Sequence, residues 1–266
     1  MRLTIRHETV YRYDAPVRYA LQRVRQTPVN GPGQKVLEWA VGFEGAERDC
    51  SYTDGFGNKV LLARMSGQEI ASLSIVAAGI VETTDNAGVY GKTQGFTPAW
   101  LYCRLTPLTT PDDALCEIGA THLGPGDRLS ALHALSGAIR DRISYDPEKT
   151  EVTTTAAQSF AAGHGVCQDH AHIFIAACRS AGQPTRYVSG YLFVEGEQNH
   201  VASHAWAEAW VDGLGWVGFD VSNRICPDER YVRVACGLDY TDAAPVTGLR
   251  RGAANEALDV RIVVNQ

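Results

Sequence analysis

The stretch that decides the fold reads Gly163-His-Gly-Val-Cys-Gln-Asp-His-Ala-His-Ile-Phe-Ile-Ala-Ala-Cys-Arg-Ser-Ala-Gly182. Its apolar residues recur at helical spacing and form one row along a helix face: Ile173, Ala177 and Ala181. Gly182 favours a helix stop, and Pro184 cannot continue a helix. The pattern therefore predicts a helix from about Cys167 to Ala181, preceded by a tight Gly-x-Gly turn.

Cys167 follows this turn and begins the predicted helix. A thiol attacks a carbonyl as the thiolate, and the unpaired N–H groups of a helix N-terminus favour negative charge. Gly163 and Gly165 let the backbone turn sharply, so that the sulfur can face a cleft. The plainer alternative is that Cys167 is a small buried residue, which is the commoner role of a single cysteine. A nucleophile also needs a base within reach.

A candidate base lies in the segment His204-Ala-Trp-Ala-Glu-Ala-Trp-Val211, whose strict alternation predicts a strand. One face of this strand would carry the larger side chains: His204, Trp206, Glu208 and Trp210. A second strand candidate, Trp216-Val-Gly-Phe-Asp220, follows the hairpin signal Asp212-Gly-Leu-Gly215. A lone strand histidine is more often a structural hydrogen-bonding group, and tryptophans at such positions are more often core.

The register of this hairpin decides whether a carboxylate can reach the imidazole. If Val211 pairs with Gly215, Asp220 becomes the diagonal neighbour of His204 on the same face, at about 7–8 Å between Cα atoms. A slip of one residue turns Asp220 to the opposite face. In the first register Cys167 attacks a carbonyl, His204 takes and returns the proton, and Asp220 fixes the imidazole tautomer.

A metal site is the competing interpretation of this region, because four possible ligands crowd together: His164, Cys167, His170 and His172. Positions 167 and 170 share a helix face, but position 172 is rotated by about 140° from 167. Cys226 and Cys236 offer no tight spacing for further ligands, and the sequence has no D-x-D-x-D-G calcium loop. We therefore expect no metal or cofactor, and expect His170 and His172 to pack in the core or to lie on a solvated face.

The first hundred residues read as short strands with period-two alternation, separated by turn signals. This pattern favours a β-sandwich-like domain over residues 1–105. After Pro111 the apolar period becomes helical over residues 112–143 and 155–162, and β-type alternation returns after Arg186. Residues 106–266 are therefore expected to form an α+β catalytic domain.

The bulk properties narrow the class of protein. The 266 residues are 45% hydrophobic and 20% charged, an ordinary globular balance, and the net charge is −6. A net acidic chain argues against nucleic acid or an anionic membrane surface as partner. The sequence begins without an apolar leader, and its seven scattered cysteines include no C-x-x-C pair. We expect a cytoplasmic protein in a reducing compartment, and the sequence leaves its oligomeric state open.

Four motifs, taken in order, resemble those of the bacterial transglutaminase-like superfamily: Gly165-Val-Cys167-Gln-Asp169, Arg186-Tyr-Val-Ser-Gly-Tyr191, His204-Ala-Trp-Ala-Glu208 and Gly215-Trp-Val-Gly-Phe-Asp220. The N-terminal stretch is similar to the β-rich N-terminal region of these bacterial proteins, notably at Tyr11-Arg-Tyr13 and Asp54-Gly-Phe-Gly-Asn58. The resemblance implies a papain-like α+β core, an acyl-enzyme mechanism, and a triad of Cys167, His204 and Asp220. Two departures are Asp220-Val-Ser-Asn223, where Asp-Pro-Thr-Asn is usual, and Leu238, where an arginine is usual.

Members of this superfamily either hydrolyse peptides and amides or transfer glutamine acyl groups to amines. The present layout resembles bacterial members expected to be proteases, so we expect hydrolysis of peptide or isopeptide bonds in a peptide or protein substrate. Acyl transfer to amines and a non-catalytic peptide-binding module are the alternatives. The backbone N–H of Cys167 is a candidate oxyanion donor. Tyr145 is a possible side-chain donor, although core packing is commoner for such a tyrosine.

Overall fold

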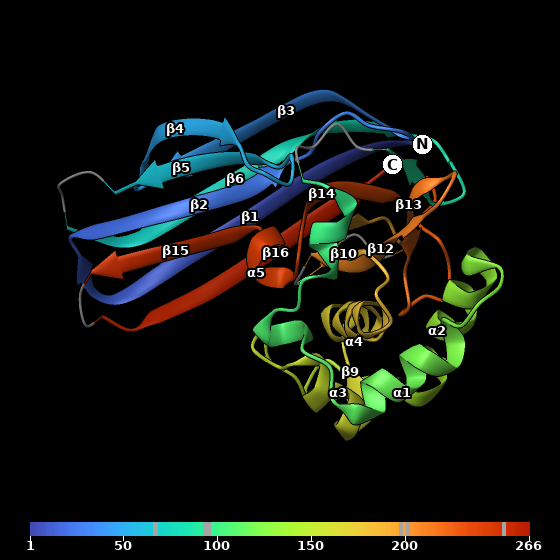
Figure 1. Cartoon of the computed structure of the whole chain (residues 1–266). Coiled ribbons are helices and arrows are strands. Elements are labelled where there is room, and N and C mark those ends of the chain that lie inside the picture. The colour runs from blue at the N-terminus through green and yellow to red at the C-terminus, as the bar shows by residue number, and fades with distance from the viewer. Residues whose placement is uncertain (66–68, 93–96, 197–198, 201–202, 252–253) are drawn as a thin grey trace.

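The computed structural model describes residues 1–65, 69–92, 97–196, 199–200, 203–251 and 254–266. An elongated pair of sheets lies beside a compact core of helices and one sheet (Figure 1). The strands of the described chain are β1 (Arg2–Val17), β2 (Tyr19–Thr27), β3 (Gln34–Glu44), β4 (Glu47–Thr53), β5 (Lys59–Arg64), β6 (Ile70–Thr83), β7 (Val89–Gly91), β8 (Ser144–Tyr145), β9 (His164–Gly165), β10 (Thr185–Leu192), β11 (Asn199–His200), β12 (His204–Val211), β13 (Gly215–Phe219), β14 (Tyr231–Gly237), β15 (Val246–Arg251) and β16 (Glu256–Asn265). Its helices are η1 (Ala99–Cys103), η2 (Pro107–Thr109), α1 (Asp113–His122), α2 (Arg128–Arg142), α3 (Ala156–Ala162), α4 (Cys167–Ser180) and α5 (Tyr240–Ala243).

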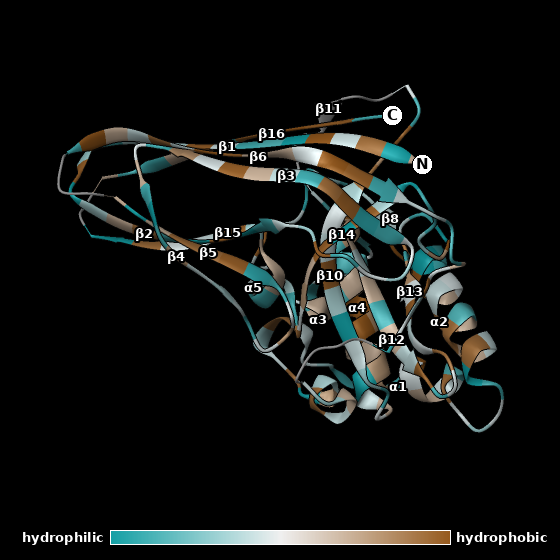
Figure 2. Ribbon diagram, turned by 90° about the horizontal axis from the view of Figure 1, so that it is seen from above, coloured by the Kyte–Doolittle hydropathy of each residue, from teal (hydrophilic) through white to brown (hydrophobic). Residues whose placement is uncertain are grey.

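The elongated part is a sandwich of two antiparallel sheets with the strand orders β11-β16-β1-β6-β3 and β15-β2-β5-β4. Figure 2 shows one sheet lying over the other. Buried Leu73 and Ile75 of the first sheet share one apolar cluster with Val24 of β2 and Met65 beside β5. Such interdigitation of two inner faces is how a β-sandwich buries its apolar surface. The predicted β-sandwich-like region is therefore confirmed.

The end of the chain returns to this sandwich. β16 pairs with β1 along its whole length, and β15 pairs with β2. Conversely, β7 belongs to the N-terminal stretch of the sequence but pairs with β13 of the compact core. The boundary near residue 105 remains a prediction, because strands from either side of it complete sheets on the other side.

The compact core has a sheet of order β14-β10-β12-β13-β7, on which α4 packs, with α1, α2 and α3 around that helix (Figure 1). Residues 168–179 of α4 are all buried. A Cβ at Gly119 of α1 would come within 2.4 Å of the carbonyl oxygen of Ala177, so only glycine permits this close crossing of α1 and α4. The α+β class and the predicted helix at 167–181 are confirmed, the helix ending at Ser180.

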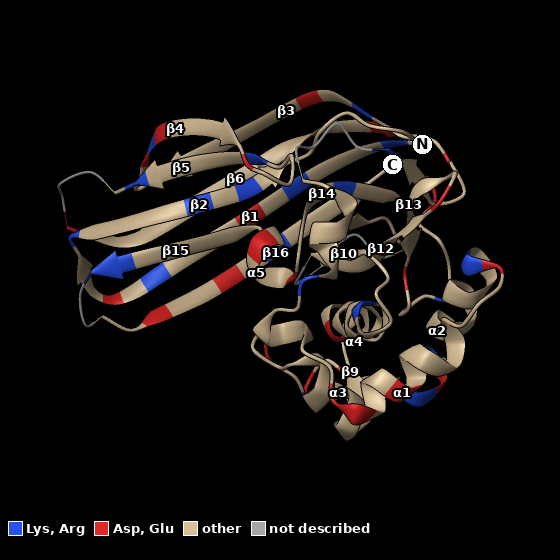
Figure 3. Ribbon diagram, viewed as in Figure 1, with Lys and Arg blue, Asp and Glu red and all other residues tan. Residues whose placement is uncertain are grey.

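Charged residues are dispersed over the molecule. Figure 3 shows basic and acidic residues interspersed along the sandwich strands rather than gathered by sign. Within the described ranges, no helix combines the length and apolar character that a membrane crossing requires.

Candidate active site

Cys167 is positioned by the turn between α3 and α4. Gly163 ends α3 with a φ of 76°, in the left-handed region that favours glycine. A Cβ at Gly165 would lie 2.5 Å from the Cβ of Asp169, so this position also has no room for a side chain. Asp169 Oδ2 accepts a hydrogen bond from the Val166 backbone N–H at 2.8 Å and stabilises the first turn of α4. Cys167 is therefore half-buried at the first residue of the helix, as predicted.

His204 and Asp220 meet across the β12–β13 hairpin. Val211 pairs with Gly215 and Ala207 with Phe219, which is the register that puts the histidine and the aspartate on one face. The Nε2 atom of His204 lies 2.6 Å from Oδ2 of Asp220. Of the two registers that the sequence left open, the structure therefore has the one in which His204 and Asp220 lie on the same face.

Asp220 is fully buried, and both oxygens of its carboxylate accept hydrogen bonds. Oδ2 also accepts from the Tyr231 hydroxyl at 2.7 Å and from Asn223 Nδ2 at 2.7 Å, and Oδ1 accepts from the Asn223 backbone N–H at 3.2 Å. Burial acts to raise the pKa of Asp220, but the hydrogen bonds from His204, Tyr231 and Asn223 hold it below its usual value. Asp220 therefore remains a carboxylate at neutral pH.

Sequence reasoning did not identify Tyr231 and Asn223 as partners of the aspartate. Asn223 follows Asp220 by three residues, a spacing typical of a local turn in which an aspartate accepts a backbone hydrogen bond. Tyr231 lies at the start of β14, and its contact depends on the pairing of β14 with β10. No local pattern predicts that contact.

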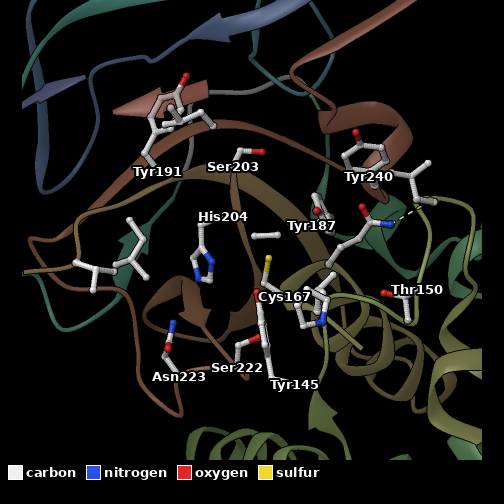
Figure 4. A pocket seen from close by; sticks show the side chains of 18 of the residues that line it. Tyr145, Thr150, Cys167, Tyr187, Tyr191, Ser203, His204, Ser222, Asn223 and Tyr240 are labelled. Carbon is white, nitrogen blue, oxygen red and sulfur yellow. Dashed lines mark hydrogen bonds between the residues drawn. The ribbon is translucent and has the colours of Figure 1, made fainter. Parts of the chain in front are cut away.

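The second partner of His204 is Cys167. Because Nε2 is bonded to Asp220, Nδ1 is the ring nitrogen left for the sulfur, and Figure 4 shows the thiol and the imidazole next to each other. Burial acts to lower the pKa of His204. The electrostatic interaction with Cys167 and hydrogen bonds with Asp220 and Cys167 outweigh burial and raise this pKa to about 10. The surroundings therefore favour an imidazolium beside the sulfur.

Cys167 and His204 open onto a cavity of about 820 Å³. Its lining combines the site residues with side chains of several other elements, including Tyr145, Gln168, Tyr187, Tyr191, Ser222 and, from β16, Ile262 and Val264. Tyr145 is 51% exposed at this cavity, so the expectation that it packs in the core is wrong. Its role as an oxyanion donor remains a prediction. Trp206 and Trp216 are 3% and 2% exposed in the core, as expected, and are not among the described residues that line the cavity.

His170 and His172 are both fully buried, in agreement with the packing interpretation. His170 lies 2.7 Å from Ser222 Oγ through Nδ1, and His172 Nε2 accepts from the Tyr240 backbone N–H at 3.1 Å. Burial lowers the pKa of each to about 4. In the part of the chain that the structure describes, no three His, Cys, Asp or Glu side chains gather closely enough to hold a metal ion. Leu238, at the second sequence departure, is buried beside Tyr102 and Trp216.

Comparison with known proteins identifies both parts of the chain. Residues 119–221 match the family model of the transglutaminase-like superfamily, and residues 3–82 match that of the bacterial transglutaminase-like N-terminal region. The first match contains Cys167, His204 and Asp220. An uncharacterized protein of Mycobacterium leprae is 29% identical, over 100% of this chain and 99% of its own. One of Mycobacterium bovis is also 29% identical, over 99% of this chain and 92% of its own.

A solved structure shares the fold over nearly the whole length. It is that of a candidate cysteine protease from Cytophaga hutchinsonii, with a TM-score of 0.74, 21% identity, and coverage of 98% of this chain and 90% of its own. At this identity the likeness shows the architecture alone. Together with the match of residues 119–221 to the family model, it confirms the predicted transglutaminase-like core fold with a β-sandwich-like N-terminal region.

Proposed function

Because this chain belongs to the transglutaminase-like superfamily, we propose that it is a cysteine-nucleophile enzyme that hydrolyses peptide or amide bonds, isopeptide bonds included. The observation that carries the proposal is that Cys167 contacts His204 at the wall of the cavity, while His204 in turn contacts the buried Asp220. Acyl transfer by a thiol requires three groups of this kind: a thiol at the start of a helix, an imidazole beside it, and a hydrogen-bonded carboxylate behind the imidazole.

The roles follow from this geometry. The Cys167 thiolate attacks the carbonyl carbon, and the C–N bond breaks as His204 gives its proton to the leaving nitrogen. Asp220 holds the ring through Nε2, so that Nδ1 faces the reaction. The backbone N–H of Cys167 and the Tyr145 hydroxyl are the proposed donors to the oxyanion. Water activated by His204 then hydrolyses the thioester and restores the thiol.

Hydrolysis rather than transfer to an amine is supported by what lines the cavity. An enzyme that transfers acyl groups to amines must keep water from the thioester. The tryptophans of β12 and β13 offer no such shield, since Trp206, Trp210 and Trp216 are all absent from the described residues that line the cavity. The cavity that the thiol faces is lined in part by polar side chains such as Ser222 and Gln168.

The test is a mass-spectrometric cleavage assay on a peptide library that includes lysine isopeptides, with and without added butylamine. We expect products with new carboxyl groups that disappear in Cys167→Ala and His204→Ala but persist in Cys50→Ala, whose thiol is exposed on the sandwich. Predominant butylamides would assign the enzyme to amine transfer. Binding of peptides without any turnover that depends on Cys167 would refute an enzymatic function.

A further inference from the structure

Ser222 lies in the turn that follows Asp220 and lines the same cavity as Cys167 and His204. Figure 4 shows it beside Cys167, between Asn223 and Tyr145. Its side chain is half-buried, and Oγ lies 2.7 Å from Nδ1 of His170, one turn along α4 from the cysteine. The proposed mechanism gives neither Ser222 nor His170 a role.

The direction of this hydrogen bond follows from the second contact of His170. Its Nε2 lies 3.3 Å from the carbonyl oxygen of Ile143. A carbonyl oxygen only accepts, so Nε2 carries the ring proton. Burial lowers the pKa of His170 to about 4, so the ring is neutral at pH 7 and Nδ1 presents a lone pair. The Ser222 hydroxyl must therefore donate its one hydrogen to His170.

Because its one hydrogen is donated to His170, the Ser222 hydroxyl oxygen can only accept further hydrogen bonds. The residue is also held from its backbone, because Arg140 donates from Nε to the Ser222 carbonyl at 3.0 Å. Arg140 Nη1 donates to the Ile143 carbonyl at 3.0 Å, the same oxygen that orients His170. The hydroxyl cannot easily turn toward the cavity as a donor, since that would leave Nδ1 of His170 buried and unpaired.

We infer that Ser222 contacts the substrate and accepts a hydrogen bond from the N–H of the scissile amide, with His170 as the positioning residue that fixes its polarity. This inference deepens the proposed function and rests on it. An amide presents an N–H to such an acceptor, whereas an ester presents only an oxygen lone pair, which repels it. Ser222 therefore selects amides over esters that carry the same acyl group.

The test compares two probes with one acyl group: the p-nitroanilide of N-acetylleucine, whose leaving group has an N–H, and the p-nitrophenyl ester, whose leaving group has none. In Ser222→Ala we expect kcat/KM for the anilide to fall by about three- to tenfold, the effect of one hydrogen bond, while that for the ester changes little. In His170→Phe the serine hydroxyl is released to donate, so kcat/KM for the ester should rise relative to that for the anilide. Ser51→Ala, on the exposed strand β4, is the control.

The outcomes separate the two proposals. Equal losses on both probes in Ser222→Ala, or an unchanged anilide-to-ester ratio in His170→Phe, would overturn the role of Ser222 while leaving the enzyme assignment intact. If only His170→Phe loses all turnover, Ser222→Ala decides whether the role of Ser222 stands, because Ser222 is at a half-exposed position. Absence of any cleavage that depends on Cys167 in the parent protein, with either probe, would overturn both.

Discussion

The contact between His204 and Asp220 predicts how Asp220→Asn changes the reactivity of Cys167. The pKa of His204 is about 10, against an ordinary value of 6.5. The difference of about 3.5 pH units, at 1.36 kcal/mol each, stabilises the imidazolium by about 5 kcal/mol. Cys167 and Asp220 share this stabilisation, and asparagine removes the carboxylate's part while keeping its shape. Loss of one pH unit of this net shift lowers the thiolate–imidazolium population about 10-fold, and loss of the whole net shift lowers it about 3,000-fold.

The assay is iodoacetamide labelling of each cysteine, followed by mass spectrometry between pH 5 and pH 9. At pH 6 a free thiol with a pKa of about 8.5 is almost wholly protonated. In the parent we nevertheless expect Cys167 to label faster than the other six cysteines. In Asp220→Asn the fast reaction at pH 6 should disappear and return only at alkaline pH. Asp141→Asn, which breaks an exposed ion pair with Arg224, is the control. A folded Asp220→Asn variant that labels at the parental rate at pH 6 would refute the reasoning.

Three further predictions concern stability. Glu208→Gln should lower the free energy of unfolding in urea by about 3–5 kcal/mol, because it leaves the buried guanidinium groups of Arg186 and Arg233 without a carboxylate partner. The control, Glu256→Gln at an exposed position, should change the free energy of unfolding by less than about 1 kcal/mol. Equal effects of the two substitutions would contradict this account. Three buried histidines have pKa values lowered by burial to about 4: His7, His170 and His172. Since the unfolded chain binds protons at higher pH, the free energy of unfolding should fall from pH 6.5 to pH 4, by up to about 3 kcal/mol per histidine; a flat profile in urea titrations would be inconsistent with their burial. A fragment of residues 106–266 should show no cooperative thermal transition by circular dichroism, because β15 and β16 lose their partners; a cooperative transition would show an independent domain.

The parts of the site that sequence predicted best are those set by local chemistry. The Asp212-Gly-Leu-Gly215 turn predicted the hairpin that brings His204 to Asp220, although the sequence left its register open between two pairings. Gly182, with a φ of 72°, ends α4 within two residues of the predicted position. In both cases a glycine conformation decides the structure, and a glycine is visible in the sequence.

The parts that sequence missed depend on pairing between distant segments. β8 is two residues long and pairs in parallel with β9, which puts Tyr145 opposite Gly165 and at the cavity beside Cys167. So short a strand has no periodicity to detect, and a tyrosine is usually expected in the core. The pairing of β16 with β1 is missed for a related reason. Alternation predicts a strand over residues 258–264 but does not identify its partner.

The sandwich is a structural component of the site rather than an appended module. Gln34 of β3 bonds both backbone groups of Arg233 on β14, at 2.8 and 2.9 Å. That strand carries Tyr231, which donates to Asp220. On the other side of the cavity, β16 supplies Ile262 and Val264 to the wall. The wall of the cleft and the support behind Asp220 thus both depend on strands that complete the sandwich. Changes in the sandwich should therefore alter substrate selection and the geometry of the proposed triad, even where no sandwich side chain takes part in the chemistry.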